Sequence, residues 1–383
     1  MANNTARLGD LATYVNGYAF KPSDWGDTGL PIIRIQDLTG NSYQLNRYDG
    51  DYPARIEVND GDVLISWSAS LGVYVWQRGK ALLNQHIFKV VFDKLPINKD
   101  YFVFAVEHKL AEMESKTHGA TMKHIVKKDF DSTTIPYPAI EEQAEIAERL
   151  RRITALIEKQ KEQLLLLDQL VKSRFIELFG DPVANSFGWK QALLCEVTSK
   201  IGSGATPRGG KESYQAEGIT LIRSMNVHDG RFEYKDLAHV TDEQAAQLDN
   251  VTVEDGDVFI NITGASVARS CIVPTDILPA RVNQHVAIIR CVREWLHPRF
   301  ANNMFLNDRF KGQLLDIGES GGATRQAITK QQLENLAVIL PPIALQEQFA
   351  AFVEQTDKSK LAVQQGLQEL EILKKSLMQQ YFG

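Results

Sequence analysis

The sequence predicts an α+β fold built from two similar globular domains, each followed by one long α-helix. Residues 119–180 align without a gap with residues 322–383 at a constant offset of 203, and 16 of the 62 aligned positions are identical. Unrelated chains of average composition would match at roughly one position in fifteen. The period near 200 residues is far longer than the 20–50 residues of solenoid repeats. The chain therefore contains a duplicated domain with its helix, and we expect its function to be performed twice.

The repeat extends upstream of these segments and sets the expected domain boundaries. Residues 58–63 match residues 253–258, and Asn84-Gln85-His86 matches Asn283-Gln284-His285. We predict a first globular domain over 1–140, a central helix over 141–182, a second domain over 183–342 and a C-terminal helix over 343–383.

Each globular part is predicted to be rich in strands and loops. Short apolar runs bounded by Gly, Asp, Asn and Pro are typical of buried strands. They are residues 32–35, 63–65 and 87–92 in the first copy, and 220–223, 258–260 and 286–289 in the second. The spacing of apolar residues changes to three and four over 101–116 and 298–316, which predicts a helix in each. A glycine-containing turn precedes the strands that begin at Val63 and Val258.

The two long helices are predicted from a heptad pattern of apolar residues. Their a and d positions are Gln143, Leu150, Ile157, Leu164, Val171 and Leu178, interleaved with Ile146, Ile153, Gln160, Leu167 and Arg174. The second copy carries Phe349, Thr356, Val363, Leu370 and Leu377 on one track, with Val353, Leu367 and Tyr381 on the other. Such a seam over five heptads is the signature of a coiled coil.

The narrow apolar stripe of each helix needs a partner, and the other copy is the simplest one. Two like units usually pair about a two-fold axis, so we expect the helices to form an antiparallel coiled coil with the domains in a pseudo-two-fold repeat. Lys360 and Lys374 interrupt the second seam. The alternative is that each helix folds back on its own domain.

Composition is that of a soluble globular protein, with 44% hydrophobic and 23% charged residues. No apolar run approaches the roughly 20 residues of a membrane span, and the first residues lack the apolar core of a signal peptide. Three scattered cysteines argue against a disulfide framework or a thiolate metal site, so we expect a reduced, cytoplasmic protein. The net charge is −6, so the chain lacks the overall electrostatic attraction to phosphates that drives most nucleic-acid binding.

Signatures of catalysis are absent from the sequence. Gly202-Ser203-Gly204 begins like a dinucleotide-binding loop, but Pro207 stands where its third glycine belongs. The eight histidines lack metal-ligand spacing. We therefore expect no catalytic residues and no metal site in this chain.

Domains that bind two different targets should share their scaffold and differ in their contact residues. Asn-Gln-His is identical in both copies, so a structural role is favoured over base reading, although Asn and Gln can pair with adenine. The Gly-Ala-Thr segments that begin at Gly119 and Gly322 lie among cations and suit either a phosphate or a solvated charge run. The stretches that differ most are 36–55 against 225–250, and 66–82 against 261–281.

Cations in or beside these segments are the candidate contacts. They are Arg47, Arg55, Arg78, Lys116, His118, Lys123, Arg208, Lys211, Arg231, Arg269, Arg281 and Arg325.

Several of these motifs resemble those of the specificity subunits of Type I restriction–modification systems. The proline and glutamine that open each helix, Pro138 with Gln143 and Pro341 with Gln346, are similar to that family's helix entry. Leu178-Phe179-Gly180-Asp181-Pro182 resembles the close of its central helix, and residues 201–207 resemble the opening of a target recognition domain. The first copy has Val15-Asn16-Gly17-Tyr18-Ala19-Phe20 instead.

The resemblance implies a non-catalytic DNA reader with two target recognition domains. Each domain would bind one half of a bipartite site in double-stranded DNA, and the helix pair would fix the gap between the halves. The candidate cations would be the DNA contacts. The resemblance further implies two modification subunits as partners, which bring S-adenosylmethionine and methylate adenine, and it allows for restriction subunits that use ATP and Mg. No cofactor would bind to this chain, and no membrane is implied.

Two alternatives stay open at the level of sequence. One is a specificity subunit whose partner fuses methylation and cleavage in one chain. The other is a coiled-coil scaffold that binds only protein. A nuclease or methyltransferase that acts alone would require activity from the purified chain.

Overall fold

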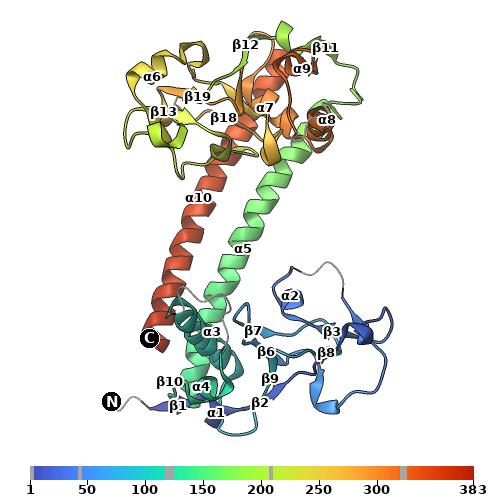
Figure 1. The fold of residues 1–383 in the computed structure, drawn as a ribbon, viewed down its shortest axis with the longest axis vertical. Coiled ribbons are helices and arrows are strands. Elements are labelled where there is room, and N and C mark those ends of the chain that lie inside the picture. The colour runs from blue at the N-terminus through green and yellow to red at the C-terminus, as the bar shows by residue number, and fades with distance from the viewer. Residues whose placement is uncertain (1–3, 42–44, 117–124, 207–209, 320–325) are drawn as a thin grey trace. The chain divides into compact units, whose positions relative to one another are not determined.

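The computed structural model describes residues 4–41, 45–116, 125–206, 210–319 and 326–383. Contacts divide the chain into two compact units (Figure 1). The first comprises residues 1–161 with 364–383, and the second comprises 162–363. Each unit therefore holds one globular domain together with part of each long helix. The order of strands and helices is broadly the same in both domains.

The first unit contains two four-stranded sheets. One is antiparallel in the order β2 (Thr13–Asn16), β9 (Ile87–Val91), β6 (Val63–Ser66) and β7 (Gly72–Val75). The other runs β4 (Arg47–Tyr48), β3 (Leu30–Ile33), β8 (Ala81–Leu83) and β5 (Glu57–Val58). A separate pair joins β1 (Thr5–Arg7) to β10 (Thr134–Pro136). The helices of this domain are α1 (Leu8–Leu11), α2 (Ile35–Leu38), α3 (Lys99–Lys116) and α4 (Lys127–Ser132).

The second unit repeats this plan and adds a short hairpin. Its antiparallel sheet runs β12 (Thr198–Ser203), β20 (Val286–Cys291), β17 (Val258–Asn261) and β18 (Ser270–Ile272). A three-stranded sheet runs β16 (Ala238–Val240), β13 (Ile219–Ile222) and β19 (Ala280–Val282). The hairpin is β14 (Val227–His228) with β15 (Arg231–Phe232), and β11 (Lys190–Leu193) pairs with β21 (Ala337–Leu340). The helices are α6 (Asp242–Ala246), α7 (Pro298–Leu306), α8 (Asp308–Glu319) and α9 (Lys330–Glu334).

The six apolar runs predicted as strands are confirmed as β3, β6, β9, β13, β17 and β20. The central strands are apolar at successive positions because both faces of their sheet are covered. In β6, Val63 and Ile65 belong to one hydrophobic core and Leu64 to another. In β17, Val258 and Phe259 likewise face two different cores. Each domain is thus two cores separated by one sheet.

The turn before each central strand has the predicted form. Gly61 has a φ of 89° and Gly256 a φ of 82°, a region that glycine adopts without steric cost. The next residue closes the turn with its carboxylate. Asp62 accepts a hydrogen bond from the amide of Asn59 at 2.9 Å, and Asp257 accepts one from the amide of Glu254 at 2.8 Å.

The helix predicted over 101–116 is confirmed as α3, and the segment 298–316 is helical as predicted but is divided into two helices. Two helices, α7 and α8, occupy this segment and meet at Asn307. The backbone of Asn307 is extended, with φ −60° and ψ 132°, and its Oδ1 accepts a hydrogen bond from the amide of Arg309 at 3.1 Å. An asparagine that caps the start of the second helix ends the first one.

The two long helices, α5 (Ile140–Phe179) and α10 (Ile343–Phe382), are 40 residues each. Every residue of the predicted heptad seams is buried or half-buried, including Gln143 and Thr356. Lys360 and Lys374, which interrupt the seam, are ion-paired with Asp168 and Glu107 respectively.

The helices run antiparallel within each unit. In the first unit, Arg149 on α5 donates a hydrogen bond to the Tyr381 hydroxyl at 3.3 Å, and Gln160 lies beside Gly366. In the second unit, Asp168 pairs with Lys360 at 2.6 Å. Residue numbers therefore fall along α10 as they rise along α5.

Both helices help to close the core of each domain. Ile146 and Leu150 of α5 share a core with Phe382 of α10 in the first unit. Phe175 of α5 and Phe349 of α10 share a core in the second, with their ring centroids 5.6 Å apart. The alternative in which each helix packs only on its own domain is therefore wrong.

Candidate nucleic-acid interface

The twelve cations predicted as contacts fall into three groups in the structure. His118, Lys123, Arg208 and Arg325 lie outside the described residues. Lys116 ends α3 and Lys211 lies in a short 3₁₀ segment, Gly210–Ser213, but their side chains are not described. The remaining six can be placed: Arg47, Arg55, Arg78, Arg231, Arg269 and Arg281.

Of the three candidate arginines described in the first domain, two are bonded to its backbone. Arg47, on β4, donates to the carbonyl of Gly29 at 2.8 Å. Arg78 donates to the carbonyl of Asp37 at 3.1 Å and lies over the Trp76 ring. Both guanidinium groups are held at the surface with donors to spare. Arg55 is exposed on the 3₁₀ turn Ala54–Ile56.

Arg281 is a correction to the predicted contacts. It is only 9% exposed on β19, and its guanidinium is bonded to the carbonyls of Ala245 and Ala280 and to the carboxylate of Asp249 at 2.7 Å. A buried arginine with these partners supports the fold and cannot reach DNA. Its charge is used to bind the segment 245–249 to the sheet.

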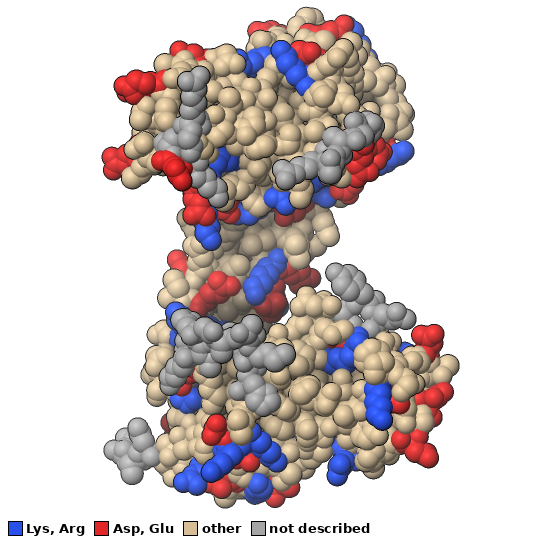
Figure 2. Space-filling view, viewed as in Figure 1, with Lys and Arg blue, Asp and Glu red and all other residues tan. Residues whose placement is uncertain are grey.

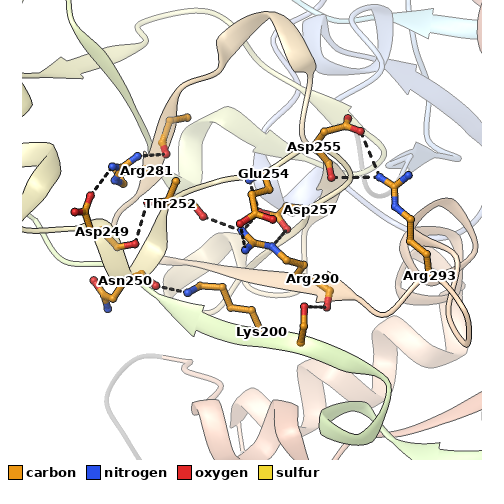
Figure 3. Close-up of polar contacts among 12 residues, drawn as sticks. Lys200, Asp249, Asn250, Thr252, Glu254, Asp255, Asp257, Arg281, Arg290 and Arg293 are labelled. Carbon is orange, nitrogen blue, oxygen red and sulfur yellow. Dashed lines mark hydrogen bonds and ion pairs between the residues drawn. The ribbon is translucent and has the colours of Figure 1, made fainter.

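Arg281 belongs to a wider set of arginine–carboxylate contacts in this domain (Figure 3). Arg290 forms two hydrogen bonds with the fully buried Asp257, at 2.8 and 2.9 Å, and also pairs with Glu254. Arg293 pairs with Asp255 at 3.3 Å. These pairs neutralise the arginines with the domain's own carboxylates. Arg231 is similarly paired with Glu233, at 3.1 Å, beyond the area of the close-up.

Opposite charges also lie close to one another on the surface. On the face shown in Figure 2, Lys and Arg side chains lie interspersed with Asp and Glu. The pattern agrees with the formal charge of −6. On this face, a DNA contact would rely on a few local cations rather than on a broad basic surface.

Arg269 differs from the other arginines of the second unit because it lines a hollow. The hollow has a volume of about 590 Å³ and lies where the loops after β13, β17 and β19 meet the chain after α8. Its lining includes Ser224, Met225, Thr263, Arg269, His285 and Gln326. Among the described residues, no hydrogen bond or ion pair involves the guanidinium of Arg269. Met225 is 44% exposed, an unusual position for a methionine.

Sequence reasoning singled out Arg269 but missed most of its neighbours in the hollow. Met225 and Thr263 lie within the two divergent stretches, so a signal for them was present. Gln326 directly follows Arg325, but no feature of the sequence singled it out. Only the tertiary structure brings these loops together.

The Asn-Gln-His segments have the structural role that the sequence favours. Asn283 is buried, and its Oδ1 accepts a hydrogen bond from the amide of His285 at 2.9 Å, which closes the turn into β20. Asn84 accepts a hydrogen bond from the amide of Gln85 at 2.9 Å in the same turn of the first domain. His285 is bonded through Nδ1 to the Thr263 hydroxyl, and thereby forms one wall of the hollow.

Four further expectations concern other parts of the chain. Both Gly-Ala-Thr segments lie outside the described residues. In the part of the chain that the structure describes, no group of three or more His, Cys, Asp or Glu could hold a metal ion. No helix within the described ranges is long and apolar enough to span a bilayer. The three cysteines are free, and burial raises the pKa of Cys271 and of Cys291 to about 12.

Two similar α+β domains with an antiparallel helix pair in each unit define a duplicated recognition module. The model of the Type I restriction modification DNA specificity domain matches residues 3–167 and again residues 189–372. The chain belongs to this family, and it is a specificity subunit that recognises DNA.

Relatives and solved structures agree with this assignment. The chain is 26% identical over 380 residues to the EcoBI specificity subunit of Escherichia coli, covering 91% of this chain and 78% of that one. It is 22% identical to the MjaVIII specificity subunit of Methanocaldococcus jannaschii, covering 97% and 90%. The fold is similar to that of an S subunit from M. genitalium, with a TM-score of 0.59, 14% identity and coverage of 99% and 96%. A structure of a type I restriction–modification assembly gives the same TM-score at 18% identity, with coverage of 99% and 97%.

Proposed function

We propose that this chain is a non-catalytic subunit that reads a bipartite site in double-stranded DNA and directs adenine methylation and restriction by partner subunits. The observation that carries the proposal is that the two domains share their structural turns but differ in their surface loops. The turns at Asp62 and Asp257 and the Asn-Gln-His turns are shared, and they support the sheets. Part of the lining of the hollow in the second domain, including Met225, Thr263 and Arg269, comes from divergent loops. Two modules with one scaffold and different surfaces suit two different half-sites.

The proposed DNA contacts are the candidate cations other than Arg281. Among the described candidates, the guanidinium groups of Arg55 and Arg269 have no hydrogen bond or ion pair. Arg47 and Arg78 are bonded to backbone carbonyls and keep further donors free. Arg231 stays a candidate because its pair with Glu233 is exposed, and exposed pairs of this kind contribute little stability. Lys116, His118, Lys123, Arg208, Lys211 and Arg325 stay proposals from the sequence.

We propose two modification subunits as the protein partners, docked on the long helices. Leu170 on α5 and Leu373 on α10 occupy the same place in the repeat and are 48% and 46% exposed. An exposed leucine repeated in both helices suits a partner that binds twice in the same way. S-adenosylmethionine, ATP and Mg would be bound by such partners, with restriction subunits as a further component. A cytoplasmic location follows from a DNA substrate of this kind.

The test is a map of methylated adenine in cells that express this chain with its modification subunits, compared with cells that lack the chain. We expect a gapped two-part motif that disappears when the chain is absent. An unchanged map would favour a scaffold that binds only protein.

Exchange of residues 1–140 for the first domain of another family member tests the two-module organisation. We expect only one half of the motif to change. A change in both halves would contradict the proposal. As a companion test of the spacer, insertion of four residues near Gln160 should alter the gap and leave both half-sites unchanged.

A further inference from the structure

Arg269 is the one arginine in the described part of the second unit whose guanidinium has no partner. The others form ion pairs or hydrogen bonds, as Arg290 does with Asp257, Arg299 with Asp357 and Arg309 with Asp181. Arg269 is half-buried at the edge of β18, yet its charge is left unmatched by any described carboxylate. Its guanidinium donors are therefore available to a ligand.

The setting of Arg269 favours a base edge over a phosphate. A phosphate site gathers several cations or backbone amides around one anion. In the described lining of the hollow, Arg269 is the only Lys or Arg. It lies beside the apolar groups of Met225, Ala265 and Ala327 and the polar groups of Ser224, Thr263, Ser266, His285 and Gln326. Apolar contacts beside a single planar donor group match the edge of a base pair.

Comparison of the two domains supports the same distinction. His285 in the hollow corresponds to His86, because each accepts a hydrogen bond from the residue after the central strand, Ile262 or Trp67. At the edge of the sheet, Arg269 lies opposite Asn261 as Gly72 lies opposite Ser66. The histidine that lines the hollow is therefore present in both domains, whereas the arginine is present only in the second. Phosphate contacts carry no sequence information, whereas contacts that specify a base must differ between modules with different targets.

We propose that Arg269 reads one guanine of the half-site bound by the second domain, with its guanidinium donating to O6 and N7 in the major groove. The inference rests on the proposed function and adds a residue and a base to it. The planar fork of an arginine fits these two acceptors, and this pairing is the commonest specific contact to DNA. Met225 would pack on the apolar edge of the neighbouring base pair.

The experiment is a methylated-adenine map for Arg269→Ala and Arg269→Lys, together with methylation of oligonucleotides in which each half-site base is replaced in turn. The complete complex with modification subunits is used. We expect both variants to lose preference at one guanine in one half-site, by roughly 5–150-fold in discrimination. Lysine keeps the charge but loses the two-point contact, so it should not restore the preference.

Arg293→Ala is the matched control, because Arg293 is an exposed arginine of the same domain that is paired with Asp255. It should leave the motif unchanged. Three outcomes would overturn the inference. They are an unchanged motif in Arg269→Ala, a uniform weakening at all positions that Arg269→Lys repairs, and a change in the other half-site. Absence of any gapped motif with the unaltered chain would instead refute the proposed function itself.

Discussion

The side chain of Gln346, at the start of α10, holds the backbone of His297, at the start of α7. Its Oε1 accepts a hydrogen bond from the His297 amide at 2.9 Å, and its Nε2 donates to the carbonyl of Pro341 at 2.8 Å. Gln143 does the same in the first unit, accepting from the Asn98 amide at 2.9 Å. Both glutamines are buried. The repeated proline and glutamine thus join each long helix to the helix that covers its domain.

Replacement of Gln346 by leucine should destabilise the second unit by about 1–3 kcal/mol, because it leaves a buried amide and carbonyls without partners. Unfolding in urea measures the loss, and hydrogen exchange of the His297 amide localises it. Gln355→Leu, on an exposed position of the same helix, is the control and should change stability by less than about 0.5 kcal/mol. Equal effects of the two substitutions would show that the bonds of Gln346 are unimportant.

The stability of the second unit should decrease at acid pH through His297. Burial lowers the pKa of His297 below the ordinary histidine value of about 6.5, and Arg293 and Arg299 lower it further, while Glu347 raises it. Its Nδ1 accepts a hydrogen bond from the Arg299 amide at 3.1 Å, which requires the neutral ring. Because the folded pKa lies below the unfolded one, the unfolded chain binds the proton more readily. Stability is therefore full above pH 6.5 and is lost as pH falls through the folded value.

The matched variant is His297→Asn, since Asn98 caps α3 in the first unit by accepting from the Tyr101 amide at 3.0 Å. Asparagine keeps the cap but does not titrate. We expect the urea midpoint of the variant to fall less than that of the unaltered protein between neutral pH and about pH 5. Parallel pH profiles would assign the acid sensitivity to other groups.

Local periodicity explains which parts of the fold the sequence could predict. The heptad spacing from Gln143 to Leu178 is a property of one helix, so it identified the seam without knowledge of the partner. The apolar runs of β6 and β17 were equally clear, because a strand buried on both faces needs apolar residues at every position. By contrast, the end of α7 depends on one capping asparagine, Asn307, which the apolar spacing does not register.

The candidate site was harder to predict, since its chemistry depends on contacts between distant segments. Arg281 and Arg269 look alike in the sequence, and both lie in the divergent stretch 261–281. Asp249 and the carbonyl of Ala245 fix Arg281 inside the domain, while Arg269 lies in the hollow without a described partner. No local pattern separates a structural arginine from an available one. Met225 and Gln326 join the site only because loops far apart in the chain meet there.

The pair formed by Lys360 and Asp168 should fix the register of the helices in the second unit. Their charged atoms are 2.6 Å apart, and the Lys360 side chain is only 22% exposed within the seam. Asp168→Lys would place like charges together and should cost about 1 kcal/mol. Combining it with Lys360→Asp should recover part of the loss, because the reversed charge also lies near Asp357. A double-mutant cycle by urea unfolding gives the coupling. Reversal of the exposed pair Glu158 and Lys161 is the control, and a coupling no larger than that of this pair would refute the role in register.

The repeated leucines, Leu170 and Leu373, should be contact points for the modification subunits. Neither belongs to the seam, and each is nearly half exposed, so a charge at either position should leave the fold intact. We expect Leu170→Glu and Leu373→Glu each to remove one modification subunit from the complex, and the double variant to remove both. A buried carboxylate at a helix interface costs more than the lost apolar contact alone.

The controls for this prediction are Leu165→Glu and Ile372→Glu. These residues are even more exposed, at 64% and 69%, but they are not repeated between the helices, where Gln368 and Gln169 take the equivalent places. The mass of the purified complex, measured by light scattering, gives the number of subunits bound. Retention of both subunits by the Leu170→Glu and Leu373→Glu double variant would exclude these leucines from the contact. Loss of a subunit in the controls alone would move the contact to the unrepeated residues, and the two binding events would then be unlike each other.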